Sequence, residues 1–504
     1  MVMLIIYTIV RAFRNTDKKH YIKLKPVAIY WLHTNRKIKT VMTKADTQLV
    51  KLEKGMLRNF KGVRKHTIAV CKAIINRKRY SRFLRILGPG LITGAADDDP
   101  SGIATYSQAG ASTGLGLLWI FPLMYPLLLA VQESCARIGA ITGKGLAAVI
   151  KENYSKKLLY VSVFLVLIAN TINIGADLGA MAATTQLFID APFGLLAVMY
   201  AVIIVLLIIF VNYKQYAKIL KWLAITLLAY PATAFLVGQN WPHVIATTFT
   251  LPTHLDSATI YIIVGILGTT ISPYLFFWDT SEVVEEEIKK HNVVKIGTVQ
   301  RATKRFLHSM RLDNFVGMTL ASLTAWFIVI ACASTLFAHG ITTINTAADA
   351  AKALEPLVQQ FPQSGLISKI IFSVGILGLG LLAVPVLAGS SSYALSEVFG
   401  WKEGLYRRFR KAKGFYIVII AATMVGLLMN FVGIDPIKAL VFSAVFNGIA
   451  AVPLLLMVNR VGNNKAIMGE YHNRLLSNVL IKITFVVMLV AVLILFWTTV
   501  QGWL

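Results

Sequence analysis

The sequence is poor in charged residues and in cysteine. Only 14% of its 504 residues are charged, whereas 56% are hydrophobic. This composition excludes a soluble multidomain protein and indicates a membrane protein with many spans. Cys71, Cys135 and Cys332 lie far apart and lack metal-ligand spacing, which excludes a disulfide framework and a structural zinc site.

Acidic residues are also scarce: 23 Asp and Glu stand against 50 Lys and Arg. Of these 50 basic residues, 22 fall within residues 1–87, together with only three acids. We expect residues 1–84 to form a cytoplasmic extension that is attracted to anionic lipid, rather than a nucleic-acid-binding segment. The apolar stretch Met1–Val10 is too short to span a bilayer and precedes no small-residue cleavage site, so it predicts neither a membrane helix nor a signal peptide.

Long hydrophobic runs fill the rest of the chain, residues 85–504. A window of about 19 residues predicts eleven transmembrane helices, centred near Ala96, Met124, Val166, Ile203, Leu227, Thr270, Ala325, Gly378, Ala422, Ala444 and Val487. Basic residues follow the even-numbered spans, and the alternate loops are nearly free of them. The positive-inside rule therefore predicts a cytoplasmic N-terminus and a C-terminus outside, in a protein of the plasma (inner) membrane.

The first span is interrupted at its centre by Asp97–Gly102, which reads Asp-Asp-Asp-Pro-Ser-Gly. A charged side chain at the bilayer midplane costs about 2.5–3.5 kcal/mol on insertion scales. The proline and glycine also weaken the helical backbone. Such a break persists where it lines a wet cavity or holds an ion. The alternative is a loop between two shorter helices.

A second interruption, around Ser272-Pro273, falls midway through the sixth span. Two broken spans at corresponding positions of two five-helix halves are typical of inverted-repeat transporters, whose sites lie where the breaks meet. We therefore predict an all-α integral membrane fold with repeats at about 85–240 and 258–458 and an eleventh helix at about 475–500. A simple proline kink at Pro273 is the alternative.

Several motifs resemble the NRAMP family of divalent-metal transporters, whose first helix carries GPG, then a DPGN break, then QAGA. The corresponding stretches here are Gly88-Pro89-Gly90, Asp99-Pro100-Ser101-Gly102 and Gln108-Ala109-Gly110-Ala111. Further likeness extends through Ala136–Gly139, Thr142–Ala147, Val452–Leu456 and Met468–Glu470. The resemblance covers about residue 85 to the C-terminus and implies a LeuT-like fold.

The resemblance also implies a metal site, because family members bind a transition metal through Asp and Asn of the first break and Met and a carbonyl of the sixth helix. Here the Asp is Asp99, the Asn position is Gly102, the Met position is Ser272 and the carbonyl belongs to Thr269. Losing the thioether removes a preference for softer metals. Hard oxygens with room for water suit magnesium, and the pattern resembles the NRAMP-related magnesium transporters.

The family's proton-handling positions differ as well. Asp177 is retained, but the flanking acids of the third helix become Asn170 and Ala180, and the two sixth-helix histidines become Tyr274 and Asp279. Neither Asn nor Tyr exchanges protons readily near neutral pH, so tight proton coupling is not expected. Asp177 either lines the path or forms a buried ion pair with a basic residue such as Lys413.

Three more polar residues are candidates for the ion or proton path. Asp97 and Asp98 have no counterpart in the family motif, and they either hold water around the ion or attract cations at the entrance. Asn447 lies close to a polar family position in the tenth span.

The sequence thus predicts a transporter that imports divalent cations by alternating access, with magnesium as the first choice of substrate and manganese as the second. A proton-coupled manganese or iron symporter is the alternative, and a channel is a third interpretation. An intramembrane aspartyl protease would require Gly-x-Gly-Asp, which Gly175-Ala176-Asp177 lacks. We therefore expect no enzyme activity, no cofactor and no nucleic-acid partner.

Overall fold

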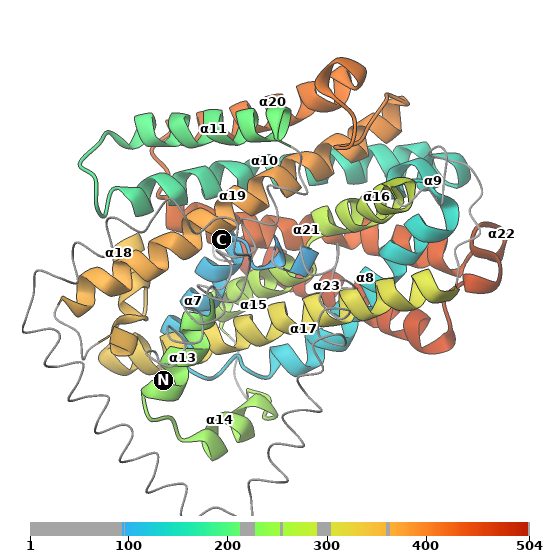
Figure 1. The fold of residues 1–504 in the computed structure, drawn as a ribbon. Coiled ribbons are helices and arrows are strands. Elements are labelled where there is room, and N and C mark those ends of the chain that lie inside the picture. The colour runs from blue at the N-terminus through green and yellow to red at the C-terminus, as the bar shows by residue number, and fades with distance from the viewer. Residues whose placement is uncertain are drawn as a thin grey trace, which may run out of the picture. The chain divides into compact units, whose positions relative to one another are not determined.

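The computed structural model describes residues 93–94, 96–211, 227–252, 256–289, 304–358 and 363–501. The predicted basic extension, residues 1–84, lies outside the described residues, so this division of the chain stays a prediction. Every regular element that the structure describes is a helix (Figure 1). The all-α class is confirmed.

The helices of the first half begin directly after the first interruption. Their bounds are α7 Pro100–Thr113, α8 Ile120–Thr142, α9 Leu146–Asn153, α10 Lys156–Thr185, α11 Phe193–Phe210, α13 Ala229–Leu236 and α14 Trp241–Thr248. The short helix α9 connects α8 to α10, and the short helix α14 lies between α13 and the second half.

The helices of the second half begin with the second interrupted span. Their bounds are α15 Ser257–Thr270, α16 Pro273–Lys289, α17 Lys304–Thr335, η2 Phe337–His339, α18 Ala347–Lys352, η3 Glu355–Val358, α19 Ser364–Phe399, η4 Phe409–Lys411, α20 Lys413–Met429, α21 Pro436–Asn463, α22 Lys465–Met468, η5 Gly469–Tyr471 and α23 Leu475–Gln501.

Seven stretches of the described residues are long and apolar enough to cross a bilayer, and α20 is a shorter apolar helix. The prediction of an integral membrane protein is therefore supported. The count of eleven is not confirmed: α8, at the second predicted span, is not among the seven stretches, and the first and fifth predicted spans extend into residues that the structure does not describe.

Both predicted interruptions are present in the structure. The helical segment before the first break ends at Asp97. Asp98 and Asp99 are not helical, and α7 begins at Pro100. In the second half, α15 ends at Thr270 and α16 begins at Pro273 after two non-helical residues. The second interruption is therefore a break rather than a kink. The first break separates helical segments by only two residues, so no long loop intervenes.

The packing of the two halves follows a symmetric pattern. Helix α7 of the first half packs on α17 of the second, and the equivalent pair is α16 of the second half on α8 of the first. In the same way, the contact of α10 with α20 is matched by the contact of α19 with α11. Such exchanged pairs are expected when two repeats are related by a pseudo-two-fold axis. A Cβ on Gly94 would stand 2.5 Å from the backbone of Gly317 in α17, so small residues allow the broken helix to approach its neighbour closely.

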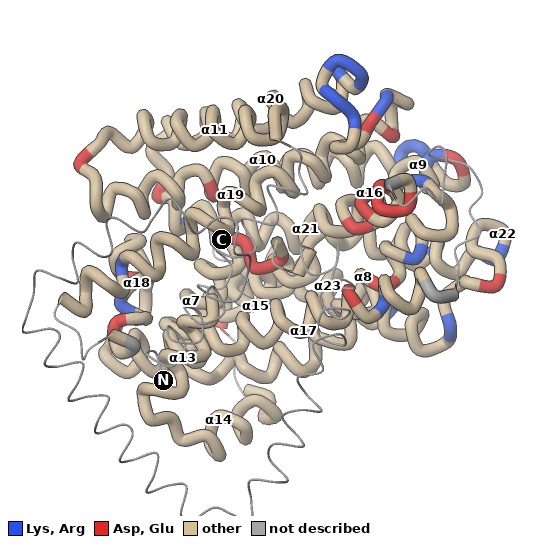
Figure 2. Tube along the Cα trace, viewed as in Figure 1, with Lys and Arg blue, Asp and Glu red and all other residues tan. Residues whose placement is uncertain are grey.

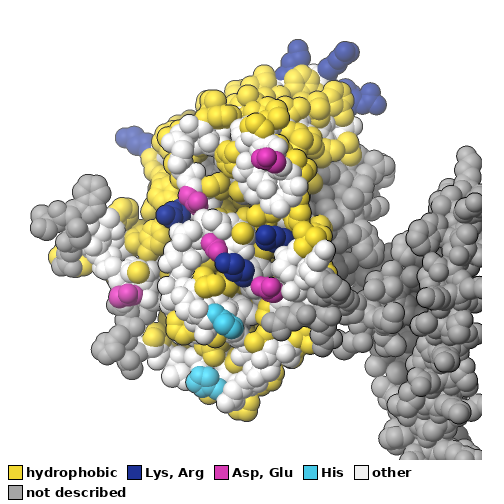
Figure 3. All heavy atoms as spheres, turned by 90° about the vertical axis from the view of Figure 1, so that its left-hand side faces the viewer, with side chains coloured by type: hydrophobic (Ala, Val, Ile, Leu, Met, Phe, Trp, Pro, Cys, Tyr) yellow, Lys and Arg dark blue, Asp and Glu magenta, His cyan; other side chains and the backbone are white. Residues whose placement is uncertain are grey.

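Charged residues concentrate at one end of the helices, near α9, the end of α16 and α22, and the middle is largely uncharged (Figure 2). Figure 3 looks onto the face at the left-hand side of Figure 1, where apolar and uncharged side chains predominate. Within α18, Lys352 pairs with Asp349 at 3.1 Å. The distribution follows the predicted positive-inside pattern, although the orientation itself stays a prediction.

Candidate cation site

Asp99 organises the first break because its side chain caps α7. Its Oδ1 accepts hydrogen bonds from the Gly102 backbone N–H and the Ser101 hydroxyl, both at 2.7 Å. Pro100 occupies the first helical turn, where its missing N–H costs nothing. The side chain of Asp99 is only 1% exposed. The local sequence therefore buries a carboxylate at the point where the helix starts.

Gly102 lies directly beside the second broken helix. A Cβ added there would stand 3.1 Å from Thr269 Oγ1 and 3.3 Å from the Tyr106 ring. Thr269 Oγ1 is buried and has no hydrogen-bond partner among the described residues. The glycine at position 102 thus lets the first break approach Thr269 and Tyr106 so closely that a side chain there would crowd them. The structure brings Asp99, Gly102 and Thr269 together, as expected from the sequence.

Ser272 turns its hydroxyl back onto the end of α15. Its Oγ lies 3.2 Å from the carbonyl oxygen of Gly268 and also hydrogen-bonds the carbonyl of Thr269. The Thr269 carbonyl keeps a second lone pair. A neighbouring bond of 2.7 Å between the Tyr106 and Thr270 hydroxyls joins α7 to α15. Hydroxyl and carbonyl oxygens therefore supply the polar atoms of the second break.

Asn173 of α10 is a site residue that the sequence analysis missed. Its Nδ2 donates to Asp99 Oδ2 at 2.8 Å and lies 3.5 Å from Asp177 Oδ2. Its Oδ1 accepts from the Ser443 hydroxyl of α21 at 2.6 Å. Asn173 precedes Asp177 by one helical turn, and this spacing could have indicated a shared face. No such signal exists for Ser443.

The ion pair between Asp177 and Lys413, considered from the sequence, does not form. Asp177 is fully buried, whereas Lys413 is exposed at the start of α20. Helix α20 crosses α10 much further along, where a Cβ on Gly175 would stand 2.5 Å from the carbonyl oxygen of Gly426. Thirteen residues of helix separate Lys413 from that crossing, about 20 Å. Asp177 instead faces Asn173.

Three further candidates are buried with unsatisfied oxygens. Oδ1 of Asp97, Oδ1 of Asp98 and both amide atoms of Asn447 have no hydrogen-bond partner among the described residues. Asp97 and Asp98 directly precede Asp99, and Asn447 lies on α21. Since buried polar groups are normally paired, these atoms indicate a place where water or an ion belongs.

Tyr274 and Asp279, which replace the family's histidines, have different surroundings. The Tyr274 hydroxyl donates to the carbonyl of Ala96 at 2.9 Å and thereby ties α16 to the segment before the first break. Asp279 lies further along α16, where its Oδ2 accepts from Asn314 of α17 at 3.0 Å. Asn170 donates to the Leu387 carbonyl and the Ser391 hydroxyl of α19. Asp279 is therefore not part of the cluster around Asp99.

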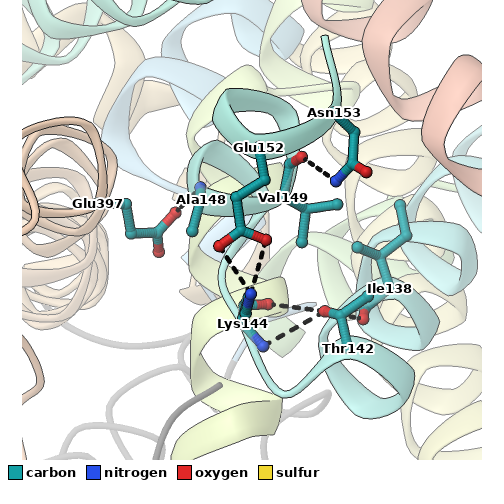
Figure 4. A network of polar contacts seen from close by, with 8 residues as sticks. All are labelled: Ile138, Thr142, Lys144, Ala148, Val149, Glu152, Asn153 and Glu397. Atoms are coloured by element: carbon teal, nitrogen blue, oxygen red, sulfur yellow. Dashed lines mark hydrogen bonds and ion pairs between the residues drawn. The ribbon is translucent and has the colours of Figure 1, made fainter. Parts of the chain in front are cut away.

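A second group of buried acids lies where α9, α16 and α19 meet. Glu397 accepts from the Ala148 N–H of α9 at 3.0 Å (Figure 4) and from the Ser281 hydroxyl of α16 at 3.2 Å. A Cβ on Gly145 would stand 1.6 Å from Glu397 Oε1, which explains the glycine in the Thr142–Ala147 motif. In the following loop, burial raises the pKa of Glu403 well above its usual range, and nearby Glu397 and Glu285 add to the shift.

The residues at the two breaks form a cluster of hard oxygen atoms around buried carboxylates. Among the described residues, no three His, Cys, Asp or Glu side chains form a ready-made metal cluster. The available groups are carboxylates, hydroxyls, an amide and backbone carbonyls. Paired broken helices with carboxylates at the break define a membrane carrier for cations.

Comparisons with known proteins identify the family. Residues 90–498 match the family model for Nramp, natural resistance-associated macrophage protein-like. The chain is 26% identical over 434 residues to the divalent metal cation transporter MntH of Ralstonia nicotianae, covering 84% of this chain and 93% of the relative. It is 26% identical over 409 residues to MntH of Caldanaerobacter subterraneus, covering 79% and 89%. The chain belongs to the Nramp family of divalent metal transporters.

The fold agrees with a solved structure of this kind. The manganese transporter of Eremococcus coleocola superposes with a TM-score of 0.65 at 18% identity, covering 82% of this chain and 86% of that chain. The predicted LeuT-like architecture is confirmed. The relatives are transporters rather than enzymes, so the protease interpretation is excluded. In this family the divalent metal is the transported substrate rather than a cofactor.

Proposed function

We propose that this protein imports magnesium across the plasma membrane by alternating access. The observation that carries the proposal is the set of hard oxygens at the breaks, where the Asp99 cap lies beside buried oxygens of Asp97, Asp98 and Thr269 that have no hydrogen-bond partner among the described residues. An asparagine at position 102 would add a direct ligand, and glycine adds none. Without it, the cation keeps more of its own water.

The chemistry of magnesium matches these surroundings. Mg²⁺ dehydrates reluctantly and usually keeps several waters while it binds one or two carboxylates. Asp99 would supply the carboxylate, and the unpartnered oxygens of Asp97, Asp98 and Asn447 would accept hydrogen bonds from the waters. Ser272 offers no thioether, so the site lacks the soft ligand that favours later transition metals.

Manganese is the second candidate substrate, and the comparisons favour it. The relatives carry names that specify divalent metal cation transport, and the Eremococcus protein is a manganese transporter. Asp99 and the Thr269 carbonyl are also acceptable ligands for manganese. Proton-coupled manganese or iron symport is therefore the alternative function.

We further propose that import does not require proton entry. Tyr274 and Asn170, at positions where the family has titrating groups, form hydrogen bonds to backbone carbonyls instead. A divalent cation is already driven inward by an interior-negative potential, worth about 2.3 kcal/mol per charge per 100 mV. Asp177 and Asp279 are the remaining candidates for proton exchange.

The orientation completes the proposal. The basic residues 1–84 would lie in the cytoplasm against anionic lipid, and the end of the chain after α23 would lie outside.

The decisive experiment is uptake by the full chain in liposomes with the membrane potential clamped. Magnesium, calcium and manganese are compared, and internal pH is recorded at the same time. Magnesium uptake without acidification supports the proposal. Manganese uptake with stoichiometric acidification that disappears in Asp177→Asn or Asp279→Asn would establish the proton-coupled alternative.

A double variant, Gly102→Asn with Ser272→Met, tests the basis of selectivity. Adding an amide oxygen and a thioether should raise the preference for manganese over magnesium, on the order of 10-fold. Gly102→Ala is the matched control, because it introduces the same crowding 3.1 Å from Thr269 Oγ1 without a ligand. If the double variant and the control show the same selectivity as the starting protein, ligand softness does not set it.

A further inference from the structure

We propose that Asn173 is a positioning residue that takes the place of the cation when the transporter returns without cargo. The inference depends on the proposed cation transport but not on which divalent ion is carried. It assigns a task to the one amide that lies between Asp99 and Asp177.

The geometry places one nitrogen against two carboxylates. Nδ2 of Asn173 lies 2.8 Å from Asp99 Oδ2 and 3.5 Å from Asp177 Oδ2. All three side chains are at most 1% exposed. Among the described residues neither aspartate forms an ion pair. Two carboxylates so close together repel each other in a medium of low dielectric constant, and the amide N–H groups offset part of that repulsion.

Ser443 fixes the direction in which the amide points. Its hydroxyl donates to Asn173 Oδ1 at 2.6 Å, although it also lies 2.7 Å from the Leu440 carbonyl. A flipped amide would turn its oxygen toward both carboxylates and be repelled. The N–H groups of Asn173 therefore face Asp99 and Asp177.

This arrangement competes with a bound cation. The positive charge of a divalent ion would attract the carboxylate oxygens that Asn173 contacts, and the waters of the ion would donate hydrogen bonds to them. The amide N–H groups must then withdraw from Asp99. Asn173 thus forms these hydrogen bonds in the unloaded transporter, in which no cation neutralises Asp99 and Asp177.

The consequence concerns one half of the transport cycle. Net uptake requires the unloaded transporter to reorient, whereas exchange of internal for external cation needs only the loaded transporter to do so. Removing the amide should therefore slow net uptake selectively. A ligand for the cation, or a residue needed only for folding, would affect both processes.

The test compares net uptake with cation exchange for the full chain in liposomes, using the divalent ion that the unchanged protein carries. For Asn173→Ala we expect net uptake to fall about 10-fold and exchange to stay within about twofold. Ser443→Ala, which leaves Asn173 in place but frees its orientation, should show the same selective loss to a smaller extent. Asn430→Ala is the control, since it removes an amide that donates to the Gly175 carbonyl of α10 at 2.8 Å; both rates should persist.

Equal loss of both rates in Asn173→Ala protein that elutes as a single species, or no loss of either, would overturn the inference. If Asn173→Ala does not fold, Ser443→Ala decides by the same criterion. Absence of any cation flux in the unchanged protein would instead refute the proposed function.

Discussion

Two sets of buried acids, Glu397 on one side and Asp97, Asp98 and Asp177 on the other, differ in how their oxygens are hydrogen-bonded. At the end where α9, α16 and α19 meet, both oxygens of Glu397 accept hydrogen bonds. Near the first break, Asp97 and Asp98, and Asp177 on α10, each have an oxygen without a partner among the described residues. Both groups are buried.

The difference separates a structural acid from a cation-binding one. A carboxylate whose oxygens are filled by backbone and hydroxyl donors fastens helices to one another. A carboxylate with a free oxygen at bilayer depth retains a large desolvation cost until a cation or water reaches it. Burial alone does not distinguish Glu397 from Asp97, Asp98 and Asp177, and the hydrogen-bond partners do.

The largest expected effect is at Asp99. Asp99→Ala should reduce cation uptake in liposomes to the background of protein-free vesicles, because this carboxylate lies where both breaks meet. Losing the hydrogen bonds from Ser101, Gly102 and Asn173 should lower the free energy of unfolding by about 1–3 kcal/mol. Removing a buried charge that has no ion pair should offset part of this loss, so the protein should still fold. Size-exclusion elution and thermal unfolding serve as controls for the fold, and normal uptake by folded Asp99→Ala would remove the site from this region.

Glu397→Ala should lower the stability of the fold and leave the choice of transported ion unchanged. It leaves the Ala148 N–H and the Ser281 hydroxyl without their acceptor, which should lower the free energy of unfolding by about 1–3 kcal/mol. Ion preference should not change. The matched control is Glu152→Ala, which breaks the ion pair with Lys144 seen in Figure 4. This pair is partly exposed and should contribute at most about 1 kcal/mol.

Asp97→Asn and Asp98→Asn sharpen the comparison within the first break. Each keeps the shape of the side chain and removes one negative charge, so the KM for the cation should rise by up to about 10-fold through a weaker local field. The maximal rate should change less. Uptake measured across a range of cation concentrations separates the two parameters, and a lost maximal rate at unchanged KM would contradict this explanation.

Asp279→Asn should have the smallest effect. Its Oδ2 already accepts from Asn314, away from the cluster around Asp99. Uptake should stay within about twofold of the unchanged protein, since an amide can still hydrogen-bond Asn314. A strong loss of uptake would assign Asp279 to the ion path after all.

Much of this protein could be predicted from its sequence. Hydrophobic runs indicate membrane helices because the bilayer requires long apolar segments with satisfied backbones. The breaks at Asp99 and Ser272 are visible because Pro, Gly and acids contradict a membrane helix. Gly102 and Thr269, assigned through the family resemblance, do lie side by side.

Only the tertiary structure decided which partners the buried polar groups have. Asn173 reaches Asp99 on another helix and Ser443 on a third, while Glu397 reaches α9 and α16 across the fold. Sequence periodicity reports which face of a helix a residue occupies, but not which distant helix covers that face. Lys413 illustrates the limit, because its charge suits Asp177 but the crossing of α10 and α20 keeps the two apart. Helix crossings, set by close contacts such as Gly175 with Gly426, therefore determine which acids are neutralised and which are left for the cation.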